Sequence, residues 1–178
     1  MDKEFAQLQT LATERKEETV NGRRFVTGRI GQHEVVMQQC GIGKVNSAIG
    51  AVEMINNFHP DLLMSTGVAG GADTSLEVTE VVVSTECCYH DVYCGDECQM
   101  GQVLGMPSRF ACSKELVDKA TSLDCPTRVR SGLIVSGDWF VNTREKMQSI
   151  LDNFPEAMAV DMESCSIAHT CHIYNTPF

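Results

Sequence analysis

The sequence has 178 residues, enough for one well-packed domain and too few for two of ordinary size. Its net charge of −10, from 24 acidic and 14 basic residues, argues against a nucleic-acid or anionic-membrane partner, because both require a basic surface. Apolar residues make up 43% of the chain, yet no apolar run reaches the roughly 20 residues of a membrane span. The first ten residues lack the apolar core of a secretion signal, so we expect a cytoplasmic protein.

The N-terminal part of the chain predicts a helix, a hairpin and a second helix. Apolar side chains recur at helical spacing within residues 1–15. Arg23–Ile30 and His33–Cys40 have the composition of strands, and Gly31-Gln32 between them fits a hairpin turn. Helical spacing returns over residues 45–55 after a glycine-containing turn.

A second glycine-rich turn, Thr66–Gly71, follows a predicted short buried strand at Leu62–Met64. Three glycines in five residues allow the backbone to approach a ligand closely. The turn lacks both the Gly-Lys-Ser/Thr of a nucleotide-binding loop and the Gly-x-Gly-x-x-Gly of a dinucleotide site. A plain strand-to-loop turn is an equally good interpretation of the pattern alone.

The rest of the chain alternates strands with helices. Tyr89–Met106 is a long irregular stretch, and a loop of that size in a compact domain is usually functional. The alternation predicts an α/β fold with a mixed, mostly parallel central sheet flanked by helices. The predicted strands and helices are 78–84, 113–122 (helix, capped by Ser113), 129–136, a helix capped by Thr143, 157–160 and a helix after Asp161.

Two acids, Asp161 and Glu163, lie where the last of these strands runs into its helix. Carboxylates are favoured there because the first amides of a helix point toward them. In open α/β sheets this is also the edge at which ligands bind. An N-cap followed by an acidic first turn explains the same residues without any function.

The nine cysteines contain no Cys-x-x-Cys pair, and we expect reduced thiols and no metal. Cys94, Cys98 and His90 are the nearest approach to a metal cluster, but no second ligand pair follows at a suitable spacing. His90 precedes Asp91, and we expect a structural hydrogen-bonded pair without a chemical role.

Four separated stretches together resemble the 5′-methylthioadenosine/S-adenosylhomocysteine nucleosidases of the nucleoside phosphorylase superfamily. They occur in the same order and at compatible spacing, and the likeness extends along nearly the whole chain. The stretches are GIGKVNSAIGA (Gly41–Ala51), STGVAGG (Ser65–Gly71), RSGLIVSGDWFV (Arg130–Val141) and NFPEAMAVDMESCSIAHTCH (Asn153–His172).

The resemblance implies cleavage of the bond between adenine and a 5′-thio-substituted ribose, in methionine and S-adenosylmethionine salvage. An oxocarbenium-like ribose, an attacking water and a protonated purine suit carboxylate chemistry. By resemblance, Glu4 is the base that activates water, and Glu163 binds the ribose hydroxyls and supports the cationic sugar. Met162 would lie against the sugar, and Asp161 replaces the first Glu of the family's Glu-Met-Glu triplet.

The resemblance also assigns the pocket around the base. Phe140 matches the aromatic residue that stacks on adenine, and Val141 would pair with the purine edge through its backbone. Ile42 would line the pocket for the sulfur substituent. Ala69 and Gly70 would approach the ribose through backbone groups, and Val68 stands where many members carry Ser. In the long loop, Cys98, Met100 and Leu104 replace aromatic residues that members often send across a dimer interface, which implies altered preference among 5′ substituents.

At its ends the sequence departs from the family pattern. Members begin with an apolar strand before the Met-x-x-Glu element, and they continue beyond Asn-x-Pro-Phe into an Arg-x-x-Ser-Asp segment whose Asp protonates the purine. This sequence starts at that Met and stops at Phe178. We therefore expect residues 1–178 to form a single nucleoside phosphorylase-like domain, incomplete at both ends, of a longer polypeptide.

Alternative functions are a purine nucleoside phosphorylase of the same superfamily, a futalosine-cleaving relative and a non-catalytic adenosine-binding relative. A phosphorylase needs a cationic phosphate site, and the glycine-rich turn has no Arg or Lys beside it. A protein that only binds has no need of both Glu4 and Glu163. The resemblance implies a homodimer with a small-molecule nucleoside as ligand and no cofactor.

The 178-residue protein is expected to have little or no hydrolase activity on 5′-methylthioadenosine compared with a longer family member, because the Asp segment that protonates the purine is missing from the sequence. Adenine release by the two purified proteins, compared under identical conditions, tests this. Equal rates would contradict it.

Overall fold

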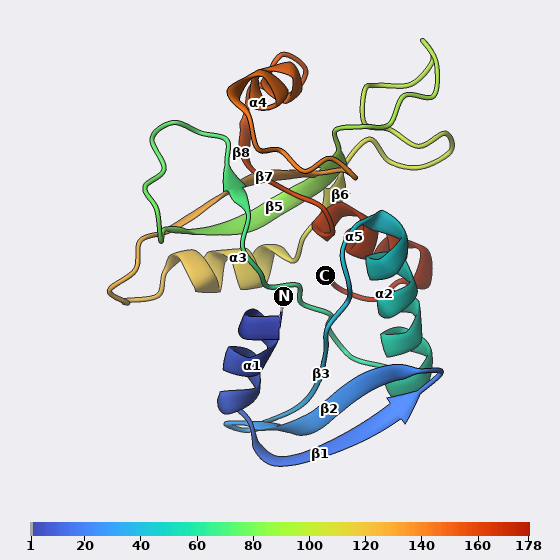
Figure 1. Ribbon diagram of the computed structural model, residues 1–178, viewed down its shortest axis with the longest axis vertical. Helices are drawn as coiled ribbons and strands as arrows, with labels where there is room; N and C mark the ends of the chain where they lie inside the picture. Colours follow the sequence, from blue (N-terminus) through green and yellow to red (C-terminus); the bar gives the residue numbers. More distant parts are fainter. Residues whose placement is uncertain (1) are drawn as a thin grey trace.

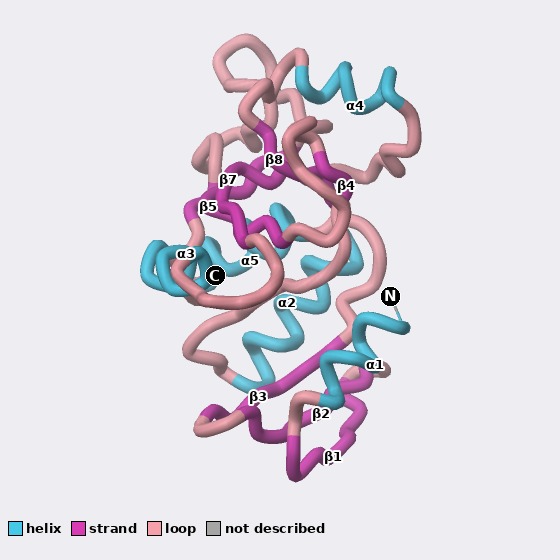
Figure 2. Tube along the Cα trace, turned by 90° about the vertical axis from the view of Figure 1, so that its left-hand side faces the viewer, coloured by secondary structure: helices cyan, strands magenta, loops and turns pink. Residues whose placement is uncertain are grey.

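The computed structural model describes residues 2–178 as two β-sheets separated by helices (Figures 1 and 2). None of the helices in this described part is long and apolar enough to cross a membrane. In chain order the elements are α1 (Asp2–Thr10), β1 (Thr13–Val20), β2 (Arg23–Ile30), β3 (His33–Gln38), α2 (Lys44–Phe58), β4 (Gly70–Gly71), β5 (Val81–Tyr89), β6 (Phe110–Ala111), α3 (Lys114–Thr121), β7 (Val129–Ser136), α4 (Arg144–Leu151), β8 (Ala157–Asp161) and α5 (Ser164–Tyr174).

The N-terminal sheet is antiparallel, with strand order β1-β2-β3. The predicted hairpin of β2 and β3 is confirmed, with Ile30 paired to His33 across the turn. The helix expected over residues 1–15 ends at Thr10, and β1 follows it. The turn between β1 and β2 is Asn21-Gly22, both with positive φ, a pair that favours tight hairpins.

An apolar cluster around α2 joins the N-terminal sheet to the rest of the molecule. The α2 helix packs on the sheet through Phe25, which is completely buried and whose ring centroid lies 4.8 Å from that of Phe58. On its other side α2 meets α5, whose Ile167 and Cys171 belong to the same cluster. The helix predicted over residues 45–55 is confirmed, and together with α5 it separates the two sheets.

The second sheet has the strand order β4-β8-β7-β5-β6 and confirms the α/β class. The strands β5, β7 and β8 are parallel, whereas the two-residue strands β4 and β6 pair antiparallel at the edges. The sheet is thus mixed. The strand expected at Leu62–Met64 is not formed, and among the described residues the amide of Leu63 bonds only to the Pro177 carbonyl.

Helices cover both faces of this sheet. Successive residues of β5 point to opposite sides, so that Cys87 packs with Cys165 of α5 while Cys88 packs with Ile150 of α4. The strand predicted at 129–136 and the helices predicted at 113–122, after Thr143 and after Asp161 are confirmed. The Thr143 hydroxyl caps α4 by accepting from the Lys146 amide, whereas the Ser113 side chain makes no cap bond.

Phe25→Ala is expected to lower the free energy of unfolding by about 3–5 kcal/mol, because it empties a fully buried site between β2 and α2. Urea unfolding of the two proteins measures the difference. Val78→Ala, at a side chain that is 93% exposed, is the matched control and should leave stability nearly unchanged. Equal stability of the Phe25 variant and the parent would contradict this packing.

Candidate active site

The carboxyl ends of β5, β7 and β8 meet at one edge of the sheet, because the three strands run parallel. Asp91 lies just beyond β5, Asp138 just beyond β7, and Glu163 just beyond β8. The turn that starts α2 reaches the same edge, since its amides bond to two of these carboxylates. Four segments distant in the sequence therefore share one site.

Glu163 is half-buried, and its Oε1 accepts a hydrogen bond of 2.8 Å from the Gly43 amide. Burial raises the pKa of Glu163 above its ordinary value, and the nearby Asp161 carboxylate adds to the rise, while the Gly43 amide opposes it. The glutamate is held by a backbone dipole at the start of α2, and no Lys or Arg forms an ion pair with it among the described residues.

The Asp161 carboxylate accepts hydrogen bonds from other residues of the protein. Its Oδ1 accepts from the Ser136 hydroxyl at 2.5 Å, and its Oδ2 accepts from the amide of Ser164 at 3.1 Å and from the Ser164 hydroxyl. These bonds fix the end of β8 against the end of β7 and satisfy the first amide of α5.

The glycine-rich turn is joined to the same edge by β4. Gly70 pairs with Val160, three residues before Glu163. Glu4, in the first turn of α1, reaches this turn from the other direction, and its Oε1 accepts from the Val68 amide at 2.9 Å. Glu163 thus follows β8, which pairs with β4, and Glu4 bonds to the turn that leads into β4.

Apolar side chains stand exposed around these carboxylates. Ile42 is 67% exposed, Val68 71% and Phe140 72%, so these large apolar side chains are accessible to a ligand or a partner. Ala69 and Gly70 are also exposed, whereas Met162 and Val141 are partly buried. Lys146 of α4 donates to the Phe140 carbonyl at 2.9 Å and so anchors the loop that presents the ring.

Sequence reasoning missed an ion network at this edge. Lys44 donates to both carboxylate oxygens of Asp91, at 2.9 and 2.8 Å, and Asp91 also accepts from the Asp138 amide at 2.8 Å. Asp138 in turn accepts from the Lys44 amide at 2.8 Å. The signal was present in the GIGK, YHD and SGD segments, where polar residues follow turns or strand ends.

The predicted hydrogen-bonded pair of His90 with Asp91 is wrong. His90 is only 3% exposed, and neither ring nitrogen has a hydrogen-bond partner in the part of the chain that the structure describes. Its ring instead lies edge-on to Trp139, with centroids 5.2 Å apart, and occupies the space that Gly137 leaves free. Burial lowers the pKa of His90, and the neighbouring Asp91 carboxylate opposes this fall.

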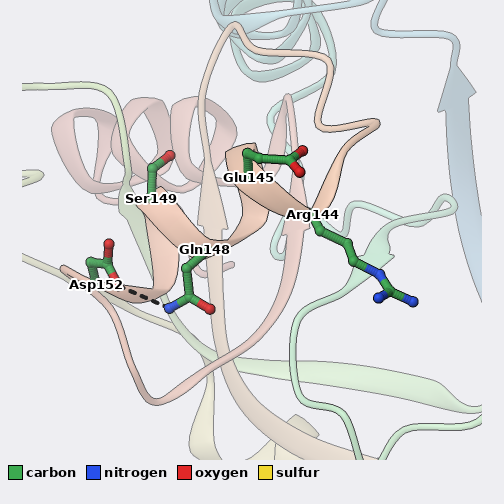
Figure 3. A pocket seen from close by; sticks show the side chains of 5 residues that line it. All are labelled: Arg144, Glu145, Gln148, Ser149 and Asp152. Atoms are coloured by element: carbon green, nitrogen blue, oxygen red, sulfur yellow. Dashed lines mark hydrogen bonds between the residues drawn. The ribbon is translucent and has the colours of Figure 1, made fainter.

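The nine cysteines are free thiols, and within residues 2–178 no group of three or more His, Cys, Asp or Glu is placed to hold a metal ion. A shallow hollow of about 470 Å³ lies on α4 (Figure 3). Its lining comes from a single polar helix face, where Gln148 donates to Asp152 at 2.9 Å, and it includes none of the predicted site residues.

Comparison with known proteins identifies the family. The family model described as "Phosphorylase superfamily" matches residues 1–178. A 5′-methylthioadenosine/S-adenosylhomocysteine nucleosidase of Staphylococcus saprophyticus is 45% identical over 157 residues, which cover 86% of this chain and 69% of that protein. The chain belongs to this nucleosidase family of the phosphorylase superfamily.

Solved structures agree with this assignment. The nucleosidase from Colwellia psychrerythraea in complex with adenine is 36% identical and superposes with a TM-score of 0.95, covering 100% of this chain and 76% of that one. The nucleosidase from Neisseria meningitidis in complex with methylthio-immucillin-A gives the same identity and TM-score, with 100% of this chain and 79% of that one covered. The family predicted from four motifs is thereby confirmed.

Glu163→Gln is expected to gain stability relative to the parent as the pH rises from 4.5 toward neutrality. A pKa raised in the folded state means that the stability Glu163 contributes is full below its ordinary value of 4.5 and is lost as the pH rises through the folded pKa. Glutamine cannot ionise, yet its carbonyl oxygen can still accept from Gly43. Urea unfolding of both proteins at pH 4.5, 6 and 7 measures the difference.

The control for this test is Glu145→Gln on α4. Hydrogen bonds from its own backbone and from Thr143 lower the pKa of Glu145, so this variant should lose stability relative to the parent over the same pH range. A Glu163 variant whose stability follows the parent at every pH would show that burial does not govern this carboxylate.

Proposed function

We propose that this site hydrolyses the N-glycosidic bond of 5′-methylthioadenosine and S-adenosylhomocysteine, releasing adenine and a 5-thio-substituted ribose. The observation that carries the proposal is the arrangement of Glu163 and Glu4. Each carboxylate accepts a hydrogen bond from a backbone amide: Glu163 from Gly43, and Glu4 from Val68. These two amides belong to turns that flank one edge of the sheet. A ribose seated at this edge would have a carboxylate on either side.

In this mechanism Glu163 binds the ribose hydroxyls and stabilises the positive charge that develops on the sugar. Its raised pKa and partial burial place an ionisable group in a weakly solvated setting, where its interaction with a cation is strong. Glu4 accepts a proton from the attacking water as general base, and the departing adenine takes up a proton from solvent. Met162 packs against the sugar, next to Glu163.

The purine is proposed to lie against Phe140, with its edge facing the backbone of Val141. The exposed ring supplies the stacking surface, and Lys146 fixes the carbonyl that precedes the pairing residue. Ile42 and Val68 face the thioether substituent, and Ala69 and Gly70 approach the ribose through their backbone. We assign Asp161 to the support of Glu163, because its oxygens already accept from Ser136 and Ser164.

Water is favoured over phosphate as the nucleophile by the charges at the site. A phosphate would need several cationic donors, and the two acids would repel it. Lys44 is the cation bonded within this edge, and its ammonium is bonded to both oxygens of Asp91. A homodimer and a cytoplasmic location stay predictions. The exposed row of Ile42, Val45 and Ile49 at the start of α2 supports a partner surface there.

Single-turnover adenine release tests the proposal, since a large excess of protein over 5′-methylthioadenosine detects even slow hydrolysis. Release is expected at the same rate with and without phosphate. Release that requires phosphate would instead support the phosphorylase alternative.

Glu163→Gln is expected to abolish this release, a loss of at least about 100-fold, while adenine binds almost as tightly as to the parent. Losing the carboxylate should also weaken binding of the transition-state inhibitor methylthio-immucillin-A much more than binding of adenine, because only the inhibitor extends to the sugar site. Calorimetry measures both affinities. Glu145→Gln, on the outer face of α4, is the control and should change neither affinity. Undiminished turnover by the Glu163 variant would contradict the catalytic role and favour the adenosine-binding alternative.

A further inference from the structure

The ion network of Lys44, Asp91 and Asp138 connects the two halves of the proposed nucleoside site. Lys44 follows Gly43, whose amide holds Glu163 on the ribose side. Asp138 precedes the Trp139-Phe140 segment on the purine side. Asp91 is bonded to both, through the Lys44 ammonium and the Asp138 amide.

The network has the properties of a rigid spacer. The Asp91 side chain is only 8% exposed and accepts three hydrogen bonds of 2.8–2.9 Å, so its position is fixed by charged and backbone donors. The Asp138 carboxylate closes the loop by accepting from the Lys44 amide. The ammonium of Lys44 also lies 5.5 Å from the centroid of the Tyr89 ring, on the strand that leads into Asp91.

Gly43 shows how tightly these parts fit. Its φ of 86° favours glycine, and a Cβ at this position would lie 2.7 Å from Oδ1 of Asp138. The amides of residues 43 and 44 therefore donate to Glu163 and Asp138 respectively, from a backbone conformation in which a side chain at residue 43 would be strained. A shift of the loop that carries Asp138 and Phe140, called the purine loop below, would therefore move the Gly43 amide that holds Glu163.

We propose that Asp91 is a positioning residue for the intact nucleoside: through Lys44 and Asp138 it sets the spacing between the Glu163 carboxylate and the purine loop. The proposal rests on the proposed function, because it assumes that ribose and purine occupy these two places. A spacer contributes to binding only when both places are filled by one molecule. Adenine alone or 5-methylthioribose alone does not depend on the spacing.

The test compares three neutral ligands in calorimetry: adenine, 5-methylthioribose and the 7-deaza analogue of 5′-methylthioadenosine, which joins base and sugar and resists cleavage. In Asp91→Asn the affinity for the joined analogue is expected to fall about tenfold, while each fragment binds within about twofold of the parent. Neutral ligands exclude a simple effect of the lost charge on a cationic inhibitor. Fluorescence of Trp139, the single tryptophan of the sequence, reports the purine loop in the same samples.

Two further variants keep the experiment decisive. If Asp91→Asn fails to fold because an unpaired Lys44 is left half-buried, the double variant Asp91→Asn/Lys44→Met removes both charges and should fold, with the same selective loss for the joined analogue. Lys44→Arg keeps the charge pair and should preserve most of the affinity for the joined analogue.

Glu80→Gln is the matched control. Glu80 lies at the opposite end of β5, its side chain is also 8% exposed, and it pairs with Arg128 at 3.3 Å. The variant is expected to lower stability while leaving the three affinities in their parental ratio.

The outcomes separate the two proposals. A selective loss for the joined analogue in the Asp91 variants, absent from Glu80→Gln, supports the positioning role. Equal weakening of all three ligands, no weakening, or the same selective loss in the control would overturn it. A parent protein that binds neither adenine nor the joined analogue would instead refute the proposed function.

Discussion

Two consecutive backbone amides at the start of α2 organise the candidate site. The amide of Gly43 donates to Glu163, and the amide of Lys44 donates to Asp138. The carboxylates come from the loops after β8 and β7, and the positive end of a 15-residue helix favours both. One helix terminus therefore fixes two strand ends relative to each other.

This arrangement depends on the packing beneath it. The α2 and α5 helices are joined by a buried hydrogen bond of 2.6 Å between Ser47 and Ser166, and the Ser47 hydroxyl also bonds to the Gly43 carbonyl. The same helices enclose the apolar cluster around Phe25. The acids are thus held by a layer whose position is set by the core, and a polar network at the surface alone would leave them free to move.

The elements that the sequence predicts well are those whose regularly spaced apolar side chains are buried in the structure. Buried strands such as Val129–Ser136 and the helix after Asp161 fall into this group. The β1 strand was missed because seven of its eight side chains are exposed and five are charged. Its stability comes from the backbone ladder to β2, and no buried face marks it. The Asn21-Gly22 pair was the available signal. Leu62–Met64 shows the reverse, since a short apolar run forms a strand only where a neighbour offers pairing.

The site was predictable to the extent that it follows from strand ends and family motifs. The acids after β8 were expected at the ligand edge, and the four motifs do converge there. The link between them was not predictable. Lys44, Asp91 and Asp138 lie in turns where polar residues are usually solvated, and only three-dimensional contact shows that they bond to one another. The predicted pair of His90 with Asp91 was wrong for a related reason, because the Asp91 carboxylate bonds to Lys44 instead.

The way the acids are held bears on the chemistry they can perform. A carboxylate paired with Lys or Arg has its charge largely neutralised, whereas one held by an amide keeps its full charge for a ligand. Glu163 is held by an amide, while the nearby cation, Lys44, is bonded to Asp91. The charge of Glu163 is therefore available at the place proposed for the sugar. Such a charge would attract a positive ribose in the transition state and would repel an anionic nucleophile, which supports the proposed cleavage by water.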